Sequence, residues 1–432
     1  MTNSLSRVLF AGTAIAVMAT AGAAQAGGFA LREQSAYFQG MSFAGSAAPG
    51  PSISSMFWNP ATVTTAEGLV VESHSTLVVP DSDINVTSAT LDPPFAIVPT
   101  PLGLIPGAAV GNGDDIGQGA FVPSFYSAYK VSEQVYVGLA VNGQYGLATN
   151  APTAWAGQVY SRVSKVFSVN VNPTVGYKIN DMVSIAAGLQ AQYLKVRLSR
   201  ATSIFSGAPS AELEGDDWGF GATLGVTFTP MEGTEIGIGY RSQIKHELSG
   251  SLFTGAISLP IDASITTPDM ITASIRQRIT DAFTLTGTVE WTNWSVLGTI
   301  PVTTTGGVVA TTLPFNYEDG WFFAVGGEYA INEELTVRGG VGYELSPIDT
   351  NIRSTRLPDN DRLWLSAGLS YNVTDRLSVD LGYSHIFVED ADIRITPGHQ
   401  DYAGVSLIGT AETDLDIVGV SVRYTLGGPN GS

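Results

Sequence analysis

The sequence predicts an all-β fold: a fourteen-stranded antiparallel transmembrane β-barrel with its N-terminal segment held inside the lumen. Three observations carry this prediction. Short polar turns recur about every fifty residues, the segments between them alternate apolar and polar residues, and about forty residues near the start follow neither pattern. Barrels of bacterial outer membranes cross the bilayer with an even number of such strands.

Six turns divide most of the chain into pairs of strands. The runs that flank them alternate with a period of two, which is the period of a strand and not of a helix. Six hairpins give twelve strands, and one further strand on each side, roughly residues 68–80 and 411–426, brings the total to fourteen. The turns are Ser132-Glu133, Asn180-Asp181, Pro230 to Gly233, Thr280-Asp281, Asn332-Glu333 and Thr374-Asp375.

The alternation assigns one face of each strand to lipid and the other to the lumen. Glycines inside strands, as in Gly237-Ile238-Gly239 and Gly339 to Gly342, leave room in the lumen for a plug or a ligand. After the first turn an apolar face opposes a small or polar one: Val135, Val137, Leu139 and Val141 against Tyr136, Gly138, Ala140 and Asn142.

Four segments are expected along the chain. Residues 1–26 are typical of a secretory signal, because Arg7 precedes an apolar run that ends in the small-residue sequence Ala24-Gln25-Ala26. Residues 27–67 break the strand pattern and are expected to form a hatch, since a barrel of this width can hold a plug. Residues 68–426 form the barrel and 427–432 a C-terminal tail.

The chain is strongly acidic, with a formal charge of −19 that becomes −20 once Arg7 is removed. Nucleic acid is therefore not expected as a partner. Acidic pairs fall in the expected outer loops, where they are either solvated loop tips or sites for divalent cations that bridge to lipopolysaccharide phosphates. They are Asp114-Asp115, Asp216-Asp217, Glu318-Asp319, Asp359 with Asp361, and Glu389-Asp390 with Asp392.

The outer loops carry more apolar residues than exposed loops normally do. The first, roughly residues 81–118, is long and rich in proline, and loops near 200–214 and 251–267 are also apolar. These side chains either fold over one another or form a landing site for a hydrophobic ligand. As capture residues we expect Phe95, Ile97, Leu104, Phe205, Phe253 and Leu259.

Strand parity places several charged residues in the lumen, where they either tie the hatch to the wall by ion pairs or offer a counter-charge to a substrate carboxylate. Arg338 is the first candidate for that counter-charge, because Leu335, Val337 and Val341 mark the opposite face of its strand as lipid-facing. Arg241 is the second. The set comprises Arg162, Arg241, Arg276, Arg278, Arg338, Glu290, Glu328 and Glu344.

Enzymatic and metal chemistry find little support in the sequence. There is no cysteine, and the four histidines, His74, His246, His385 and His399, lack the spacing of metal ligands. Ser73-His74-Ser75 raises an outer-membrane lipase as an alternative, since a serine and a histidine with an orienting group suffice for acyl transfer. We expect no enzyme activity, no metal and no cofactor.

An ordered series of segments over nearly all of residues 27–426 resembles the long-chain fatty-acid transporter family of Gram-negative outer membranes, the FadL/TodX family. The series begins at the hatch and ends close to the last strand. It includes Gly28-Phe29-Ala30-Leu31, Asn59-Pro60-Ala61, Gly146-Leu147-Ala148-Thr149, Gly215-Asp216-Asp217-Trp218, Tyr240-Arg241-Ser242, Trp291-Thr292-Asn293-Trp294, Leu357-Pro358-Asp359-Asn360-Asp361-Arg362 and His385-Ile386-Phe387-Val388.

The resemblance implies passive import. In the family, outer loops catch a hydrophobic ligand, which moves to a pocket beside the hatch and leaves sideways into the bilayer. By motif match, the gating role falls on Phe29 and the transport motif on Asn59, Pro60 and Ala61. The chain departs from the family in its long first loop and in ending with Leu426 and a short tail, without an aromatic last residue.

We therefore expect an outer-membrane channel that imports long-chain fatty acids or similar hydrophobic molecules by diffusion. Its partners are the ligand, outer-membrane lipid and lipopolysaccharide. A channel for aromatic hydrocarbons is the alternative within transport. An adhesin or phage receptor that uses the loops is the alternative outside it.

Overall fold

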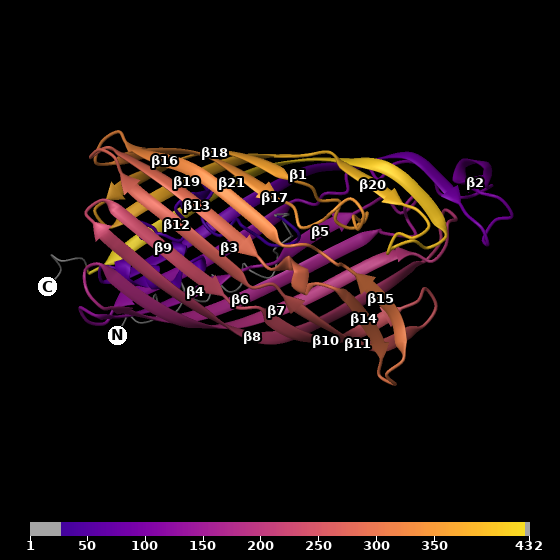
Figure 1. Cartoon of the computed structure of the whole chain (residues 1–432), viewed down its shortest axis with the longest axis horizontal. Helices are drawn as coiled ribbons and strands as arrows, with labels where there is room; N and C mark the ends of the chain where they lie inside the picture. Colours follow the sequence, from indigo (N-terminus) through magenta and orange to yellow (C-terminus); the bar gives the residue numbers. More distant parts are fainter. Residues whose placement is uncertain (1–26, 428–432) are drawn as a thin grey trace, which may run out of the picture.

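The computed structural model describes residues 27–427, which form a closed antiparallel barrel around an N-terminal hatch (Figure 1). The predicted signal peptide, residues 1–26, and residues 428–432 of the predicted tail lie outside the described residues. Closure is made by β1 (Leu69–Leu91), which pairs antiparallel with β21 (Val405–Leu426) on one side and with β3 (Ala120–Lys130) on the other. In Figure 1 the short turns gather at the left end and the longer loops at the right.

The wall has fourteen spans, as the sequence predicts. Six spans each consist of two strands in series, namely β4/β5, β9/β10, β11/β12, β13/β14, β15/β16 and β19/β20, while β2 lies outside the wall. The remaining strand bounds are β2 Thr100–Pro101, β4 Val135–Asn142, β5 Gly146–Asn150, β6 Val163–Lys178, β7 Val183–Ala201, β8 Ser210–Met231, β9 Thr234–Arg241, β10 Ile244–Phe253, β11 Ser258–Thr267, β12 Met270–Arg278, β13 Phe283–Thr292, β14 Thr299–Thr304, β15 Val309–Pro314, β16 Gly320–Ala330, β17 Leu335–Leu345, β18 Arg362–Thr374, β19 Leu377–Val388 and β20 Ala391–Ile395.

All six predicted turns connect neighbouring strands at one end of the barrel. The first outer loop is shorter than expected, because β1 continues to Leu91 instead of ending near residue 80. Its extension pairs with β21 as far as Leu91 and Val405, so residues 81–91 belong to the wall. The apolar first loop therefore begins at Asp92 and includes β2 and the short helix η4 (Leu102–Leu104).

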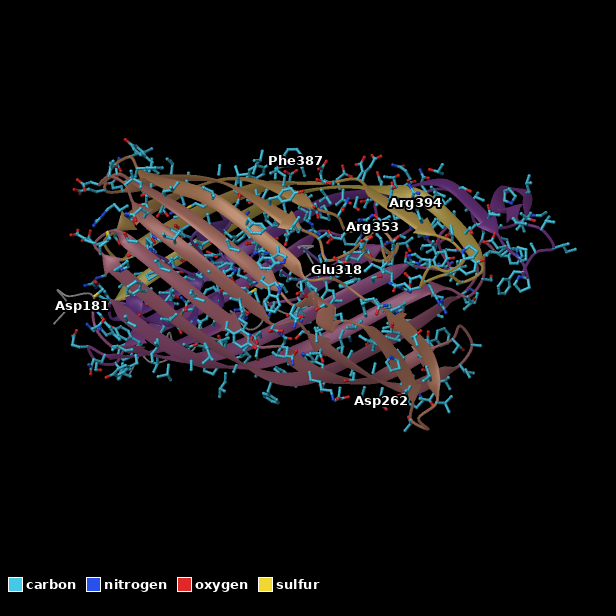
Figure 2. All side chains as sticks on the ribbon, in the orientation of Figure 1. Asp181, Asp262, Glu318, Arg353, Phe387 and Arg394 are labelled. Carbon is cyan, nitrogen blue, oxygen red and sulfur yellow. The ribbon has the colours of Figure 1, made fainter. Side chains whose placement is uncertain are left out.

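Side chains follow the predicted faces. Leu189 and Ile185 on β7 are 68% and 44% exposed, whereas the alternate residue Gln190 is buried. The exposed apolar side chains thus meet lipid. Figure 2 places the labelled residue Asp181 at the turn end and Asp262 and Arg394 toward the loop end. Within residues 27–427, no helix has both the length and the apolar character needed to cross a membrane.

The hatch consists of α2 (Ala36–Gln39), η2 (Ile53–Phe57) and η3 (Pro60–Thr65), which are too short to be stable alone and lie inside the wall. Helix α2 lies against β18, β19 and β21, and η3 against β6, β7 and β8 on the other side. Hatch and wall share one hydrophobic core, which includes Phe38, Phe43, Met56, Trp58, Phe322 and Trp364.

Strand glycines make the close approach of the hatch possible. A Cβ added at Gly237 or Gly239 would overlap with the carbonyl oxygen of Ala47 or Trp58, and one at Gly340 would overlap with Met41. These are backbone atoms of the hatch, which cannot move aside as a flexible side chain can. These contacts agree with the prediction that glycines in the lumen make room for a plug.

Candidate functional site

A cavity of about 920 Å³ lies at the loop end of the barrel, between the start of the hatch and the outer loops. Its wall comes from strands β5 to β8, β10, β11, β14 and β15, and from the loops that follow β17 and β20. The lining is mainly apolar, as a site for a hydrophobic molecule requires. The apolar lining residues include Leu147, Leu194, Leu198, Leu213, Leu248, Ile265, Ile300 and Leu313.

Phe29 brings the hatch into this lining. Its ring lies edge-on to Trp294, with 4.8 Å between ring centroids, and 5.7 Å from Tyr145. Only 4% of Phe29 is exposed. The residue to which the family resemblance assigns a gating role therefore forms part of the cavity wall, and the role itself remains a proposal.

Arg356 supplies a positive charge to the cavity. It lies in the loop between β17 and β18, is half-buried, and donates to Ser164 Oγ at 3.4 Å and to the Ser199 carbonyl at 3.2 Å. Among the described residues no carboxylate lies within ion-pair distance of it. Burial without such a partner lowers the pKa of Arg356 to about 10. Its guanidinium is thus available to an incoming anion.

Asp401 and Arg200 line the same end of the cavity. Asp401 lies in the loop between β20 and β21, and its Oδ2 has no hydrogen-bond partner among the described residues. Burial raises the pKa of Asp401 to about 6, while the charges of Arg356 and Arg200 act in the opposite direction. The cavity therefore combines a long apolar body with one small charged end.

The predicted capture residues divide into two groups. Phe95 and Phe205 line the cavity, which places two apolar loops at its entrance. The other four are not part of the lining. Of these, Ile97 and Leu104 are 100% and 74% exposed at the tip of the first loop, Phe253 is 41% exposed, and Leu259 is half-buried on β11.

The Asn59-Pro60-Ala61 motif joins the hatch to strand β8, one of the strands that also line the cavity. The Asn59 side chain caps η3 by accepting from Ala61 N at 3.0 Å. Its amide donates to the carbonyls of Ala47 at 2.8 Å and Val226 at 3.0 Å, the second of which belongs to β8. Asn59 thus satisfies backbone groups of both hatch and wall.

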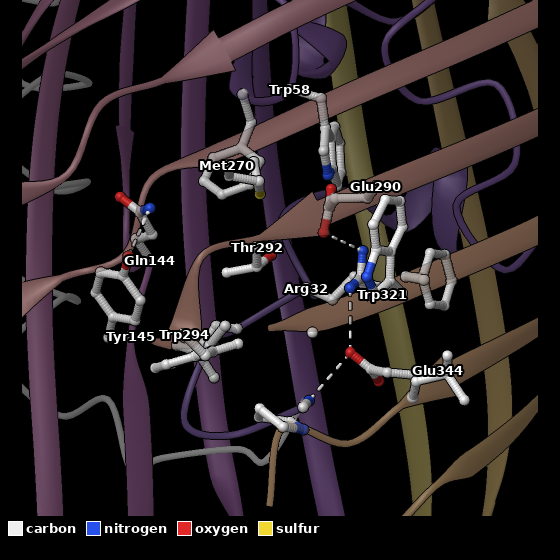
Figure 3. Close-up of a pocket in the computed structure, with 18 residues that line it drawn as sticks. Arg32, Trp58, Gln144, Tyr145, Met270, Glu290, Thr292, Trp294, Trp321 and Glu344 are labelled. Atoms are coloured by element: carbon white, nitrogen blue, oxygen red, sulfur yellow. Dashed lines mark hydrogen bonds and ion pairs between the residues drawn. The ribbon is translucent and has the colours of Figure 1, made fainter. Parts of the chain in front are cut away.

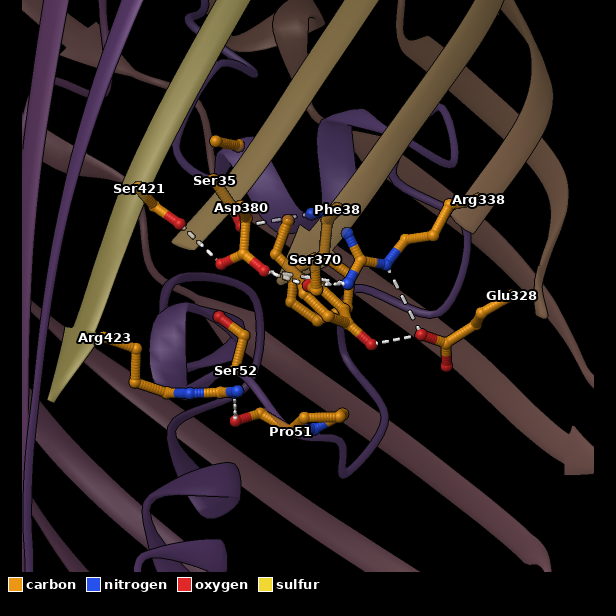
Figure 4. Close-up of polar contacts among 12 residues, drawn as sticks. Ser35, Phe38, Pro51, Ser52, Glu328, Arg338, Ser370, Asp380, Ser421 and Arg423 are labelled. Atoms are coloured by element: carbon orange, nitrogen blue, oxygen red, sulfur yellow. Dashed lines mark hydrogen bonds and ion pairs between the residues drawn. The ribbon is translucent and has the colours of Figure 1, made fainter. Parts of the chain in front are cut away.

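Arg338, the first sequence candidate for a substrate carboxylate, lies elsewhere. It stacks over the ring of Tyr37 at 3.7 Å and lies 3.5 Å from Glu328 and 3.7 Å from Asp380, with a hydrogen bond to Ser370 (Figure 4). Its side chain is 1% exposed and does not line the cavity. Its charge is already compensated, so its position fits the alternative role of tying hatch to wall.

Arg241, the second candidate, is also outside the cavity lining. It is fully buried, lies over Phe57 at 4.5 Å, and donates to the Phe57 carbonyl at 2.8 Å and to Gln190 Oε1 at 2.6 Å. Arg241, on β9, thus links η2 of the hatch to β7 of the wall. A ligand could reach it only if the hatch moved.

A break in the third span lies beside Phe29. Residues 143–145 interrupt the span between β4 and β5, and β5 pairs with β6 but forms only one isolated bridge toward β3, from Thr149 to Gly117. The hatch fills part of this break: Leu31 N donates to Gln144 O at 2.8 Å, and Gly146 N donates to Phe29 O at 2.9 Å. The ladder of the third span is thus interrupted where the hatch begins.

A second, much smaller cavity of about 30 Å³ adjoins the start of the hatch (Figure 3). Arg32 crosses it and forms ion pairs with Glu290 at 2.8 Å and with Glu344 at 3.1 Å. Sequence reasoning placed both glutamates in the lumen but missed Arg32, as it missed Arg356 and Asp401. Arg356 directly precedes the Leu357 to Arg362 segment of the resemblance, which could have drawn attention to it.

The lipase alternative at His74 and the expected position of the acidic pairs can both be compared with the structure. His74 accepts from Ala36 N at 3.2 Å and its other ring nitrogen lies 3.2 Å from Glu72, so it stabilises the hatch and activates no serine. Residues 27–427 contain no group of three or more His, Asp or Glu that could hold a metal ion.

Two acidic pairs are not solvated loop tips as expected. Asp216-Asp217 lies within β8, and Asp359 is buried beside Arg362 at 2.5 Å.

A family model for outer membrane transport proteins, described as OMPP1/FadL/TodX, matches residues 17–426. The chain belongs to this family. Its members are transport channels and not enzymes, and they reside in the outer membrane of Gram-negative bacteria.

Curated relatives in the FadL/TodX family align over almost their whole length. The long-chain fatty acid transport protein of Escherichia coli K12 is 24% identical over 454 residues, covering 94% of this chain and 98% of the relative. A 47 kDa outer membrane protein of Pasteurella multocida is 27% identical, covering 89% and 92%.

Solved structures support the fold. The chain resembles a Pseudomonas aeruginosa FadL homologue with a TM-score of 0.84 at 21% identity, covering 92% of this chain and 99% of the other. It resembles the Pseudomonas putida toluene transporter TodX with a TM-score of 0.66 at 14% identity, covering 93% and 100%. At these identities the likeness concerns the fold alone.

Proposed function

We propose that this barrel imports long-chain fatty acids by passive diffusion, and that the cavity at its loop end is the binding site. The observation that carries the proposal is the combination of a large apolar cavity with the guanidinium of Arg356, which forms no ion pair among the described residues. A long-chain acid has the same division, a long apolar body with one anionic end. The relatives named as long-chain fatty acid transport proteins support this assignment.

Hydrophobic burial supplies the driving force. A sixteen-carbon chain buried at about 0.8 kcal/mol per methylene offers on the order of 10 kcal/mol before the costs of ordering the ligand. A carboxylate carried into the cavity without a partner would lose several kcal/mol of this. Arg356 offsets that loss, so we transfer to it the role first expected of Arg338. Arg241 stays a second, deeper candidate.

The ligand enters between the apolar loops that carry Phe95 and Phe205 and leaves through the wall. We place the exit at the break at residues 143–145, because the span lacks a continuous ladder there and the hatch residues Phe29 to Leu31 fill the gap. Movement of Phe29 would open the cavity toward this break. Release into the bilayer keeps an insoluble molecule out of water throughout.

An aromatic-hydrocarbon channel is the second candidate, favoured by the likeness to toluene transporters. The cavity argues for the larger ligand. Its volume of about 920 Å³ lies near the upper limit of the roughly 300–1,000 Å³ that small-molecule sites occupy. A single aromatic ring would fill little of it and would leave Arg356 without a partner.

The test is competitive binding to delipidated protein in detergent, with palmitate, hexadecanol and toluene as ligands. Fatty-acid transport requires palmitate to bind more tightly than hexadecanol, and hexadecanol more tightly than toluene. Tightest binding of toluene would favour the aromatic channel. Binding of none of the three would overturn a transport role for this cavity.

A further inference from the structure

The first residue expected after signal cleavage is buried against a carboxylate. Gly27 N lies 3.1 Å from Oε1 of Glu344, which is labelled in Figure 3. Gly28 N lies 3.1 Å from Asp359 Oδ2. Gly27 is buried, and Glu344 is 5% and Asp359 2% exposed. The nitrogen that becomes the α-amino group of the mature chain therefore already lies at ion-pair distance from a buried acid.

The surroundings of this nitrogen are short of positive charge. Arg32 pairs with Glu290 and Glu344, and Arg362 pairs with Asp359. Glu33 is also fully buried, its electrostatic neighbours are Arg32, Glu344 and Arg362, and neither of its carboxylate oxygens has a partner among the described residues. Two arginines thus face four carboxylates in this buried cluster.

Arg353 does not remove the deficit. It approaches Asp359 from the loop side, but it donates to the backbone carbonyl of Asp359 and not to its carboxylate. With Arg353 included, three arginines face four carboxyl groups, of which Glu33 has its pKa raised by burial to about 7 and carries only part of a negative charge at that pH. A buried cluster with excess negative charge is costly, so a further cation would stabilise it.

The site has no room for a side chain at the chain start. A Cβ added at Gly27 would lie 2.7 Å from Glu344 Oε1, and one at Gly28 would lie 2.8 Å from the ring of Trp294. Gly28 also has a φ of +64°, which favours glycine. The two glycines therefore let the backbone nitrogen itself reach the carboxylates.

We propose that the α-ammonium group of mature Gly27 is the missing cation, and that Glu344 and Asp359 form a built-in site for it. Hydrolysis of the Ala26–Gly27 bond consumes one water and leaves a carboxylate on Ala26 and an ammonium on Gly27. The uncut chain offers Glu344 only a neutral peptide N–H. Cleavage thus completes the charge balance and anchors the start of the hatch.

This anchor has a consequence for the gate, which rests on the proposed function. Phe29 lies two residues beyond Gly27 and lines the cavity, so the ammonium pair fixes the segment that covers the binding site. The ammonium group would hold Phe29 in its closed position more strongly than the neutral peptide N–H of the uncut chain does. The amine site itself does not depend on which hydrophobe is carried.

The test is selective labelling of amines in folded mature protein near pH 7. The intact mass first establishes that the chain begins at Gly27. A free α-amine ordinarily labels faster than a lysine, because its pKa is about 8 against about 10.4. We expect the reverse: the α-amine should label at least tenfold more slowly than Lys245, whose side chain is 66% exposed, and should recover the ordinary order on unfolding.

Two variants separate the ammonium pair from simple burial. Glu344→Gln keeps the shape of the site but removes its charge, and one alanine inserted after Ala26 displaces the ammonium without altering the barrel. Both should expose the α-amine to label, whereas Glu389→Gln, at an exposed position, should not. A mature chain that starts elsewhere, or an α-amine that labels as fast in folded wild-type protein as after unfolding, would overturn the proposal. Either result would leave palmitate binding, and hence the proposed function, untouched.

Discussion

Two arginines, Arg338 and Arg356, lie in two regions of the lumen and differ in whether a carboxylate lies within ion-pair distance. At the interface of hatch and wall, Arg338 lies within 3.7 Å of two carboxylates, Glu328 and Asp380, and over an aromatic ring. At the loop-end cavity, Arg356 has only neutral oxygen partners. Arg338 thus has two carboxylates close to it where hatch and wall meet, whereas Arg356 forms no ion pair among the described residues and feels the nearby charge of Asp401.

The two regions also differ in packing. Strand glycines bring hatch backbone into direct contact with the wall, and the interface carries a shared core and several buried ion pairs. The cavity instead keeps about 920 Å³ open behind apolar loops. The segment from Gly27 to Leu31 lies between the two regions, because it belongs to the hatch while Phe29 lines the cavity.

The largest effect is expected from filling the interface. Gly340→Val places a side chain where the Met41 backbone lies, and these backbone atoms cannot yield, so most of the protein should fail to reach the heat-modifiable barrel form. Gly339→Val is the matched control, because the neighbouring glycine has its nearest atom, the Ser366 carbonyl oxygen, at 3.8 Å. Gel mobility before and after boiling measures both. Equal yields would mean that the hatch can lie elsewhere in the lumen.

Removal of Arg338 tests whether the interface charges are structural. Arg338→Ala leaves Glu328 and Asp380 short of a buried partner and should lower the free energy of unfolding by about 3–5 kcal/mol. Arg278→Ala breaks an exposed pair with Glu232 and should cost at most about 1 kcal/mol. Denaturant midpoints report the difference. The ratio of palmitate to hexadecanol binding should stay constant in Arg338→Ala, and a selective loss of the acid would return the binding role to Arg338.

A substitution of Arg356 in the cavity should weaken ligand binding without lowering the stability of the barrel. Arg356→Gln removes hydrogen bonds between a charged group and a carboxylate, worth about 1.5–3 kcal/mol, and should weaken palmitate about 10- to 150-fold. Hexadecanol should bind as before. Arg394→Gln, an exposed arginine paired with Asp392, is the control. Titration calorimetry in detergent measures each ligand, and an equal loss for acid and alcohol would contradict a carboxylate site.

Asn59 connects the two regions, because it belongs to the interface but is expected to affect transport. Asn59→Ala removes a helix cap and a hydrogen bond to β8, at about 1 kcal/mol for the cap, so the barrel should still insert. Uptake of palmitate by cells should drop several-fold. Thr65→Ala, which loses only a bond to Thr62 within the hatch, should import normally. Wild-type uptake by Asn59→Ala would remove the motif from the mechanism.

Much of the fold follows from the sequence because lipid imposes a simple rule on every strand. An outward apolar residue at every second position fixes the spans, and polar residues fix the turns, as at Asn180-Asp181. The rule fails beyond the bilayer. Residues 81–91 alternate less clearly, because their outward positions are polar or small while Ile84 on the other face packs into a buried cluster, and the pairing with β21 reveals them as strand.

The site was less predictable for a related reason. Parity assigns Arg338 to the lumen but cannot say whether its charge is already matched. Glu328 lies on the adjacent strand β16 and Asp380 on β19, two strands away, at positions set by strand register. Arg356 and Asp401 lie in loops, where no period applies. Charge compensation is a property of three-dimensional packing, and it decides which arginine can take a ligand.

The smallest expected effect concerns pH at the charged end of the cavity. Asp401 faces Arg356 and Arg200, and its carboxyl has a pKa raised by burial to about 6. Between pH 7.5 and 5.5 it should gain a proton, whereas burial lowers the pKa of nearby His399 below its usual value. A neutral Asp401 no longer repels a ligand carboxylate and no longer competes with it for Arg356. Palmitate should therefore bind roughly two- to fivefold more tightly at the lower pH. Hexadecanol serves as the uncharged reference for changes in the protein or detergent. In Asp401→Asn the ratio of palmitate to hexadecanol affinity should be high at both pH values and nearly constant, and a pH response that survives this substitution would mean that another group titrates at the site.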